Sequence, residues 1–155
     1  MRILVVDDEE MKRRSLAEDL TSWGHEVTAC ADGLEAATQL ARALFDVVIA
    51  DLKMPRMGGI EFIREVKKID RDAVVMVITG FADLSTAVET INLGAYDYVE
   101  KPVEVEKFRA ALERGLEKKH LLSKLRFAKG AIWTISISIP LWLILGIILA
   151  YFWKK

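Results

Sequence analysis

The sequence predicts an α/β fold in which a parallel β-sheet is covered by helices on both faces. Two observations lead to this prediction. Short apolar runs without alternation are typical of strands that are buried on both faces, as the strands of parallel sheets are. Each run is followed by a segment with the apolar spacing of an amphipathic helix. Strands and helices therefore alternate along the chain, a pattern that favours right-handed crossovers between parallel strands.

The first two strand and helix pairs have clear limits. Residues 3–6 are an apolar run that ends in acidic residues, and they predict the first strand. Residues 11–23 carry apolar side chains at helical spacing and stop at Gly24, a residue type favoured just after a helix. Residues 26–31 predict a second strand, and the alanine-rich residues 34–43 predict a second helix.

The most apolar run, residues 47–50, predicts a central third strand. The third helix is predicted by a set of apolar residues that would line one of its faces: Ile60, Phe62, Ile63 and Val66. Residues 73–78 then predict a fourth strand, 84–93 a fourth helix stopped by a glycine, and 95–99 a fifth strand. Five strands with one switch in their order suit a flavodoxin-like sheet with the strand order 2-1-3-4-5.

Composition narrows the range of partners. The chain has 155 residues, enough for one domain with a core, and its formal net charge is -1. A near-neutral charge gives no electrostatic reason to expect nucleic acid as a partner. Cys30 is the single cysteine, which excludes an internal disulfide and a thiolate metal cluster, and we expect it to be a small buried residue.

Polar residues follow four of the predicted strands at one edge of the sheet: Asp7, Asp8, Asp51, Thr79 and Lys101. Three carboxylates at one edge repel one another and call for a cation. Oxygen ligands favour a hard ion, above all Mg²⁺. A carboxylate nucleophile, a divalent metal, a hydroxyl and an ammonium are together suited to the transfer of a phosphoryl group.

Each of these residues also has an ordinary structural explanation. Asp8 could cap the first helix, Thr79 could be a turn residue, and Lys101 could be a solvated loop lysine. The occurrence of matching types at the ends of four different strands favours the chemical interpretation of the whole set.

The same positions carry sequence motifs. Val6-Asp7-Asp8-Glu9, Asp51 with the following Met54-Pro55 and Met57-Gly58-Gly59, Thr79-Gly80 and Lys101-Pro102 resemble the receiver domain of two-component response regulators. The resemblance covers about residues 1–120. It implies that Asp51 is the phosphoacceptor and that Asp7 and Asp8 form an acidic pocket. Asp8, Asp51 and the backbone carbonyl of Lys53 would bind Mg²⁺ directly.

The resemblance also implies a switch and a partner. Thr79 would bond to the phosphoryl group, Lys101 would pair with it, and Tyr98 would be the aromatic residue that turns inward as Thr79 moves. The phosphoryl donor would be a sensor histidine kinase. The chain would be an enzyme only in catalysing its own phosphorylation and dephosphorylation.

The C-terminal quarter differs in character. Residues from 104 to about 127 predict one helix that is longer than a receiver domain needs. Residues 121–130 form a helical linker beyond that domain. A charge-free apolar segment, residues 131–153, exceeds the ~20 residues that span a membrane and predicts a single transmembrane helix. Lysines and arginines gather before this segment, which places the receiver domain in the cytoplasm. Gly146 and Ala150 form a small-residue pair that suits a homodimer in the bilayer.

We therefore expect a response regulator anchored by one helix in the inner or plasma membrane. It would signal to an unknown output protein at the membrane through protein contacts, without nucleic acid. Two alternatives remain open. The chain could be a phosphate sink for a shared kinase, or a membrane scaffold that uses the receiver fold only for docking.

Overall fold

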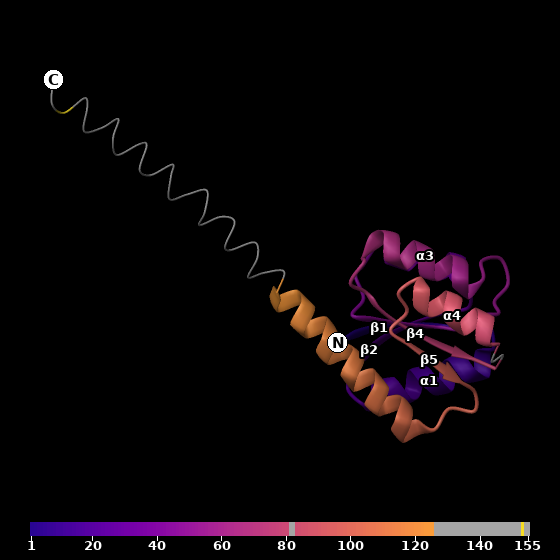
Figure 1. Ribbon diagram of the computed structural model, residues 1–155. Helices are drawn as coiled ribbons and strands as arrows, with labels where there is room; N and C mark the ends of the chain where they lie inside the picture. Colours follow the sequence, from indigo (N-terminus) through magenta and orange to yellow (C-terminus); the bar gives the residue numbers. More distant parts are fainter. Residues whose placement is uncertain (81–82, 126–152, 154–155) are drawn as a thin grey trace. The chain divides into compact units, whose positions relative to one another are not determined.

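The computed structural model describes residues 1–80, 83–125 and 153. Its centre is a five-stranded parallel sheet with the order β2-β1-β3-β4-β5, which confirms the predicted fold class and strand order (Figure 1). The strands are β1 (Arg2–Val6), β2 (Glu26–Cys30), β3 (Val47–Ala50), β4 (Val74–Thr79) and β5 (Asp97–Glu100).

Helices follow the strands as the sequence predicts. They are α1 (Glu10–Ser22), α2 (Gly33–Leu40), α3 (Gly59–Ile69) and α4 (Leu84–Asn92), and residues 105–125 are also helical. Contacts divide the chain into a compact unit, Met1–Lys119, and a second unit that begins at His120. The fold and the site described below belong to the first unit.

The sheet is buried on both faces because its central strands are apolar at every position except Arg2 at the start of β1 and Thr79 at the end of β4. Leu4, Val48 and Val75 point to one face, where they pack with apolar side chains of α2 and α3. Their neighbours in the strands point to the other face, where α1 and the helix that begins at residue 105 cover them (Figure 1). Two apolar layers therefore hold the sheet, and burial on both sides explains the absence of polar alternation in β1, β3 and β4.

Glycines end two helices as expected. Gly24 and Gly94 have φ angles of 87° and 93°, a left-handed conformation that a residue with a Cβ rarely adopts. After α4, the N–H of Gly94 donates to Ile91 and that of Ala95 donates to Thr90. These two bonds satisfy carbonyls at the helix end in the Schellman arrangement.

Several predicted bounds differ from the structure by one to three residues, and two of these differences have a visible cause. Helix α2 was expected to reach residue 43 but ends at Leu40, because the Gln39 carbonyl accepts bonds from two successive N–H groups and tightens the last turn. Strand β5 begins at Asp97, not at residue 95, because the N–H of Ala95 donates to the Thr90 carbonyl and so belongs to the end of α4.

Almost all of the predicted membrane span lies outside the residues that the structure describes. Among residues 1–80, 83–125 and 153, no helix combines the length and the hydropathy needed to cross a bilayer. Apart from Trp153, the predicted span over residues 131–153 lies outside the described residues, as does the end of the predicted linker.

Candidate functional site

The parallel register brings two acidic residues together at the carboxyl edge of the sheet. Val6 of β1 lies opposite Ala50 of β3, so the next residues, Asp7 and Asp51, are neighbours. The N–H of Asp51 donates to the Val6 carbonyl at 2.9 Å and fixes this alignment. Only 6% of Asp7 and 7% of Asp51 is exposed, so both carboxylates stand where water screens charge poorly.

Asp8 completes a group of three carboxylates. One carboxylate oxygen from each of Asp7, Asp8 and Asp51 lies within 4.8 Å of the other two. Asp8 is exposed and opens the group to solvent, where a cavity of about 270 Å³ is lined by Asp8, Asp51, Lys53 and Lys101 among others. An all-oxygen group with an open side fits Mg²⁺, which keeps several waters and takes one or two carboxylates.

Lys101 is the cation that balances the two buried acids. Its Nζ donates to Asp7 Oδ2 and to Asp51 Oδ2, each at 2.8 Å. Burial alone lowers the pKa of Lys101, but the hydrogen bonds to Asp51 and Asp7 outweigh it, and the pKa lies above the usual lysine value. The ammonium is therefore charged at neutral pH and stands between the two acids.

Backbone groups orient the same carboxylates. Asp51 Oδ1 accepts the N–H groups of Leu52 at 2.6 Å and Lys53 at 3.3 Å. Asp7 Oδ1 accepts the N–H of Glu9 at 2.9 Å. Each buried acid thus has one oxygen on backbone N–H groups and the other on Lys101, an arrangement that holds both side chains in one orientation.

The predicted switch residues lie on the two strands beyond β3. Thr79 is the last residue of β4 and is fully buried, and its carbonyl accepts the N–H of Lys101 at 2.9 Å. Tyr98 lies on β5, partly buried against the apolar cluster below α2 and α3. Burial, followed by the charges of Glu100 and Asp83, raises the pKa of Tyr98.

The structure excludes three of the ordinary structural explanations that the sequence allowed. Asp8 does not cap α1, whose N-cap residue is Glu9. Thr79 belongs to a strand and not to a turn. Lys101 has a side chain only 16% exposed and is not a solvated loop lysine. The structure brings Asp7, Asp8, Asp51 and Lys101 together at the strand ends. Thr79 and Tyr98 lie on the adjoining strands β4 and β5.

Two features of the site were not predicted. Arg13 of α1 donates from Nη1 to the Asp7 carbonyl at 2.7 Å and so supports the turn that carries both acids. Beside the acids lies a second cavity of about 620 Å³, mostly apolar, between α1 and the segment after β5. Helical spacing places Arg13 on α1 but does not say which loop its long side chain reaches.

Comparison with known proteins agrees with this geometry. The family model described as response regulator receiver domain matches residues 3–113. The transcriptional regulatory protein ZraR of Escherichia coli O157:H7 is 34% identical over 120 residues, which cover 77% of this chain and 27% of ZraR. The regulatory protein AtoC of Escherichia coli K12 is 33% identical over 133 residues, which cover 86% of this chain and 29% of AtoC.

Solved structures show the same likeness. A response regulator receiver domain protein from Clostridium thermocellum has a TM-score of 0.74 and 33% identity, over 78% of this chain and 98% of that one. NtrX from Brucella abortus has a TM-score of 0.76 and 32% identity, over 81% of this chain and 29% of NtrX. The chain thus spans under a third of the length of ZraR, AtoC and NtrX.

Proposed function

Because the chain belongs to the family of response regulator receiver domains, we propose that it accepts a phosphoryl group on Asp51 from a sensor histidine kinase. One observation carries the proposal: Asp51 is a buried carboxylate whose Oδ2 is bonded to Lys101 beside two further acids. A carboxylate held in this way is an oriented nucleophile with a positive charge next to it.

The residues of the chain supply most of the parts of the transfer. An oxygen of Asp51 forms a bond to phosphorus while the bond from phosphorus to the donor's histidine nitrogen breaks, and the electron pair leaves with that nitrogen. The Lys101 ammonium, released in part from Asp51, pairs with a phosphoryl oxygen. The hydroxyl of Thr79 donates to another. Both stabilise the charge on the equatorial oxygens.

The acidic group fits the metal that such a transfer needs. Asp8, Asp51 and the Lys53 carbonyl would hold Mg²⁺, with Asp7 beside them, and the ion would neutralise charge on the phosphoryl oxygens. Asp7 also keeps Lys101 in place through its Oδ2. Dephosphorylation is a separate step: water attacks phosphorus, the bond from phosphorus to the Asp51 oxygen breaks, and inorganic phosphate leaves. The chain therefore acts as a catalyst only on its own aspartate.

The signal leaves through a protein surface. A phosphoryl group adds close to two negative charges beside Thr79, and the movement of Thr79 toward it frees space that Tyr98 fills. Strand β5 then shifts against α4, whose exposed side includes Leu84, Val88 and Ile91 at helical spacing. An exposed apolar stripe supports a protein as the output partner.

The names of relatives suggest DNA, and not a protein, as the target of the signal. ZraR is named a transcriptional regulatory protein, but the match covers only 27% of it. The near-neutral charge of this chain supports signalling through protein contacts and not through DNA.

A small phosphodonor tests the phosphoacceptor function. We expect the purified chain, incubated with an acyl phosphate and Mg²⁺, to gain the mass of one phosphoryl group. Removal of Mg²⁺ with a chelator should suppress the gain, because the phosphoryl charge then lacks its main counter-charge. Intact-mass spectrometry over time measures both arms. Equal gain with and without Mg²⁺ would show that the acidic group does not act through a metal.

We also propose that residues 131–153 anchor the protein in the inner or plasma membrane, with the receiver domain in the cytoplasm. The support comes from the sequence: the segment has no charged residue, and basic residues gather on its N-terminal side. The output partner would then be a protein at the membrane, and Gly146 with Ala150 would support a homodimer.

Membrane extraction tests the anchor. We expect membranes washed with alkaline carbonate to retain the full chain, because an apolar helix of this length stays in the hydrocarbon core. A chain truncated before Ala131 should be released by the same wash. Immunoblots of the washed membranes and of the supernatant measure the two fractions. Retention of both chains, or release of both, contradicts the anchor.

A further inference from the structure

A buried carboxylate outside the site lies at the start of α2. Asp32 is fully buried, and its Oδ1 accepts the N–H groups of Leu34 at 2.8 Å and Glu35 at 2.9 Å, which caps the helix. Its Oδ2 forms an ion pair with the guanidinium of Arg56. Capping needs only one oxygen and no charge, so the second oxygen and the charge of Asp32 serve the contact with Arg56.

Arg56 belongs to the loop that leads from Asp51 to α3. Its φ angle is 66°, a left-handed conformation that is uncommon for a residue with a side chain. The base of this loop is closed by a bond from the N–H of Gly59 to the Leu52 carbonyl at 3.0 Å. Lys53, whose carbonyl is the proposed metal ligand, therefore lies between a fixed residue at Leu52 and a fixed residue at Arg56.

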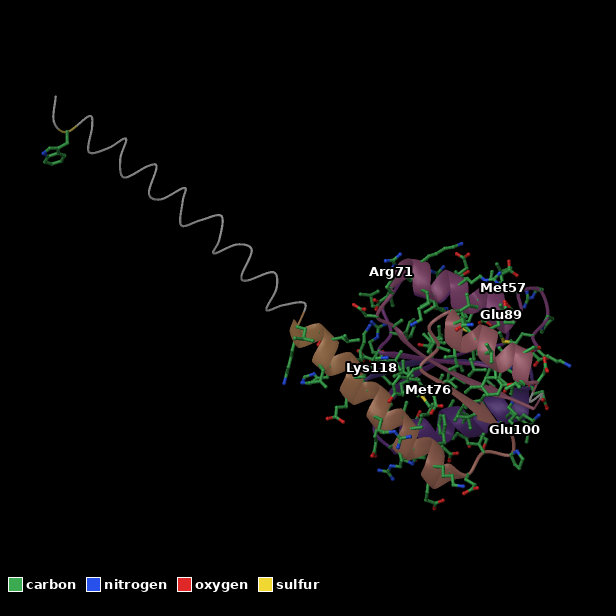
Figure 2. The ribbon with its side chains drawn as sticks, viewed as in Figure 1. Met57, Arg71, Met76, Glu89, Glu100 and Lys118 are labelled. Atoms are coloured by element: carbon green, nitrogen blue, oxygen red, sulfur yellow. The ribbon has the colours of Figure 1, made fainter. Side chains whose placement is uncertain are left out.

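The start of α2 and this loop are in close contact at a second point. A Cβ added to Gly33 would stand 2.8 Å from the Met57 carbonyl oxygen, so only glycine allows the helix to approach the loop so closely. Figure 2 shows Met57 at the end of the molecule where α3 begins, opposite Arg71 at the other end of that helix. The loop is therefore held at its tip by the start of α2 and closed at its base by the bond between Gly59 and Leu52.

We propose that the Asp32–Arg56 ion pair is a positioning device for metal binding. It holds the loop in the conformation that directs the Lys53 carbonyl at the cation shared by Asp8 and Asp51, although neither Asp32 nor Arg56 touches the cation. The left-handed conformation of Arg56 disfavours this loop shape, and the ion pair offsets that cost. The inference rests on the proposed function, because it presumes that the three acids bind Mg²⁺.

The test is Mg²⁺ binding to the purified full chain, measured by isothermal titration calorimetry. In Asp32→Asn the side-chain oxygen still caps α2, but the charge that holds Arg56 is lost. Arg56→Ala removes the pair from the other side. We expect each variant to bind Mg²⁺ about tenfold more weakly, the size of effect seen when residues behind metal ligands are lost. The double variant should bind Mg²⁺ no more weakly than either single variant, because all three variants lack the same ion pair.

Two further variants separate positioning from general damage. Arg56→Lys keeps a charge for Asp32 and should restore most of the affinity. Arg64→Ala removes a different ion pair, in which Arg64 of α3 and Glu89 of α4 lie 2.9 Å apart and both are exposed, and should leave the affinity unchanged. Circular dichroism should show that all variants are folded. If Asp32→Asn does not fold, Arg56→Ala decides, because its side chain is 63% exposed.

Unchanged Mg²⁺ affinity in folded Asp32→Asn and Arg56→Ala would overturn the inference. An affinity lost equally in Arg64→Ala would also overturn it. Failure of the proposed function looks different: the unaltered chain would then neither bind Mg²⁺ nor gain a phosphoryl group. If the unaltered chain binds Mg²⁺ and gains a phosphoryl group, and both variants bind Mg²⁺ with the same affinity as the unaltered chain, the inference alone fails.

Discussion

The Asp51→Asn variant is expected to gain no phosphoryl group from an acyl phosphate under conditions that label the unaltered chain. The asparagine oxygen can still accept the N–H groups of Leu52 and Lys53, so the backbone around the site keeps its bonds. The amide is a very poor nucleophile for phosphorus, so the variant lacks the reacting group. Intact-mass spectrometry over a time course measures the gain.

A matched control separates loss of the nucleophile from loss of a charge. The side chain of Asp46, like that of Asp51, accepts a backbone hydrogen bond, since its Oδ2 accepts the N–H of Arg2 at 2.8 Å. Asp46 lies at the opposite end of β3. Asp46→Asn should therefore gain the phosphoryl group at the normal rate. Equal gain by Asp51→Asn and the unaltered chain would show that another residue is the acceptor.

The Lys101→Met variant is expected to be less stable by about 3 kcal/mol when no divalent metal is present. The methionine fills similar space but leaves the buried carboxylates of Asp7 and Asp51 without the ammonium to which both are bonded. Removal of one partner of a buried ion pair is strongly destabilising because the remaining charge is uncompensated. Urea unfolding followed by circular dichroism, in a chelator, measures the difference.

Added Mg²⁺ should stabilise Lys101→Met more than the unaltered chain, because the cation replaces the missing positive charge. Lys107→Met is the control: it removes an ion pair with Glu104 in which both side chains are well exposed, and it should change the free energy of unfolding by less than about 0.5 kcal/mol. Equal stability of Lys101→Met and the unaltered chain in chelator would contradict the role given to Lys101.

The pH dependence of this contribution has a defined sign. The pKa of Lys101 is raised in the folded chain, mainly because the bonds to Asp51 and Asp7 overcome the effect of burial. A raised lysine pKa contributes stability that is complete below the ordinary lysine pKa and is lost as the pH rises through the raised value. The ion pairs are therefore intact throughout the neutral range.

Much of this site follows from the sequence because topology alone brings strand ends together. Once residues 3–6 and 47–50 are identified as neighbouring parallel strands, Asp7 and Asp51 must be adjacent. The same reasoning places Thr79 and Lys101 at that edge. Apolar runs without alternation predicted the burial of β1, β3 and β4, since only a sheet covered on both faces accommodates them.

Other features could not be predicted, because they depend on where long side chains and loops meet in space. Asp32 and Gly33 lie between the predicted second strand and the predicted second helix, and no pattern in the sequence pairs Asp32 with Arg56 across two loops. The bond from Arg13 to the Asp7 carbonyl likewise joins a long side chain to a loop, and no sequence pattern indicates it. The end of α2 also depends on a shared carbonyl, which spacing does not reveal.

The position of the phosphoryl group tests the central claim most directly. After incubation with an acyl phosphate and Mg²⁺, reduction with borohydride converts a phosphorylated aspartate into homoserine, which tandem mass spectrometry locates in peptides. We expect conversion at Asp51, with Asp7 and Asp8 unchanged. Conversion at Asp7 or Asp8, with Asp51 unchanged, would contradict it.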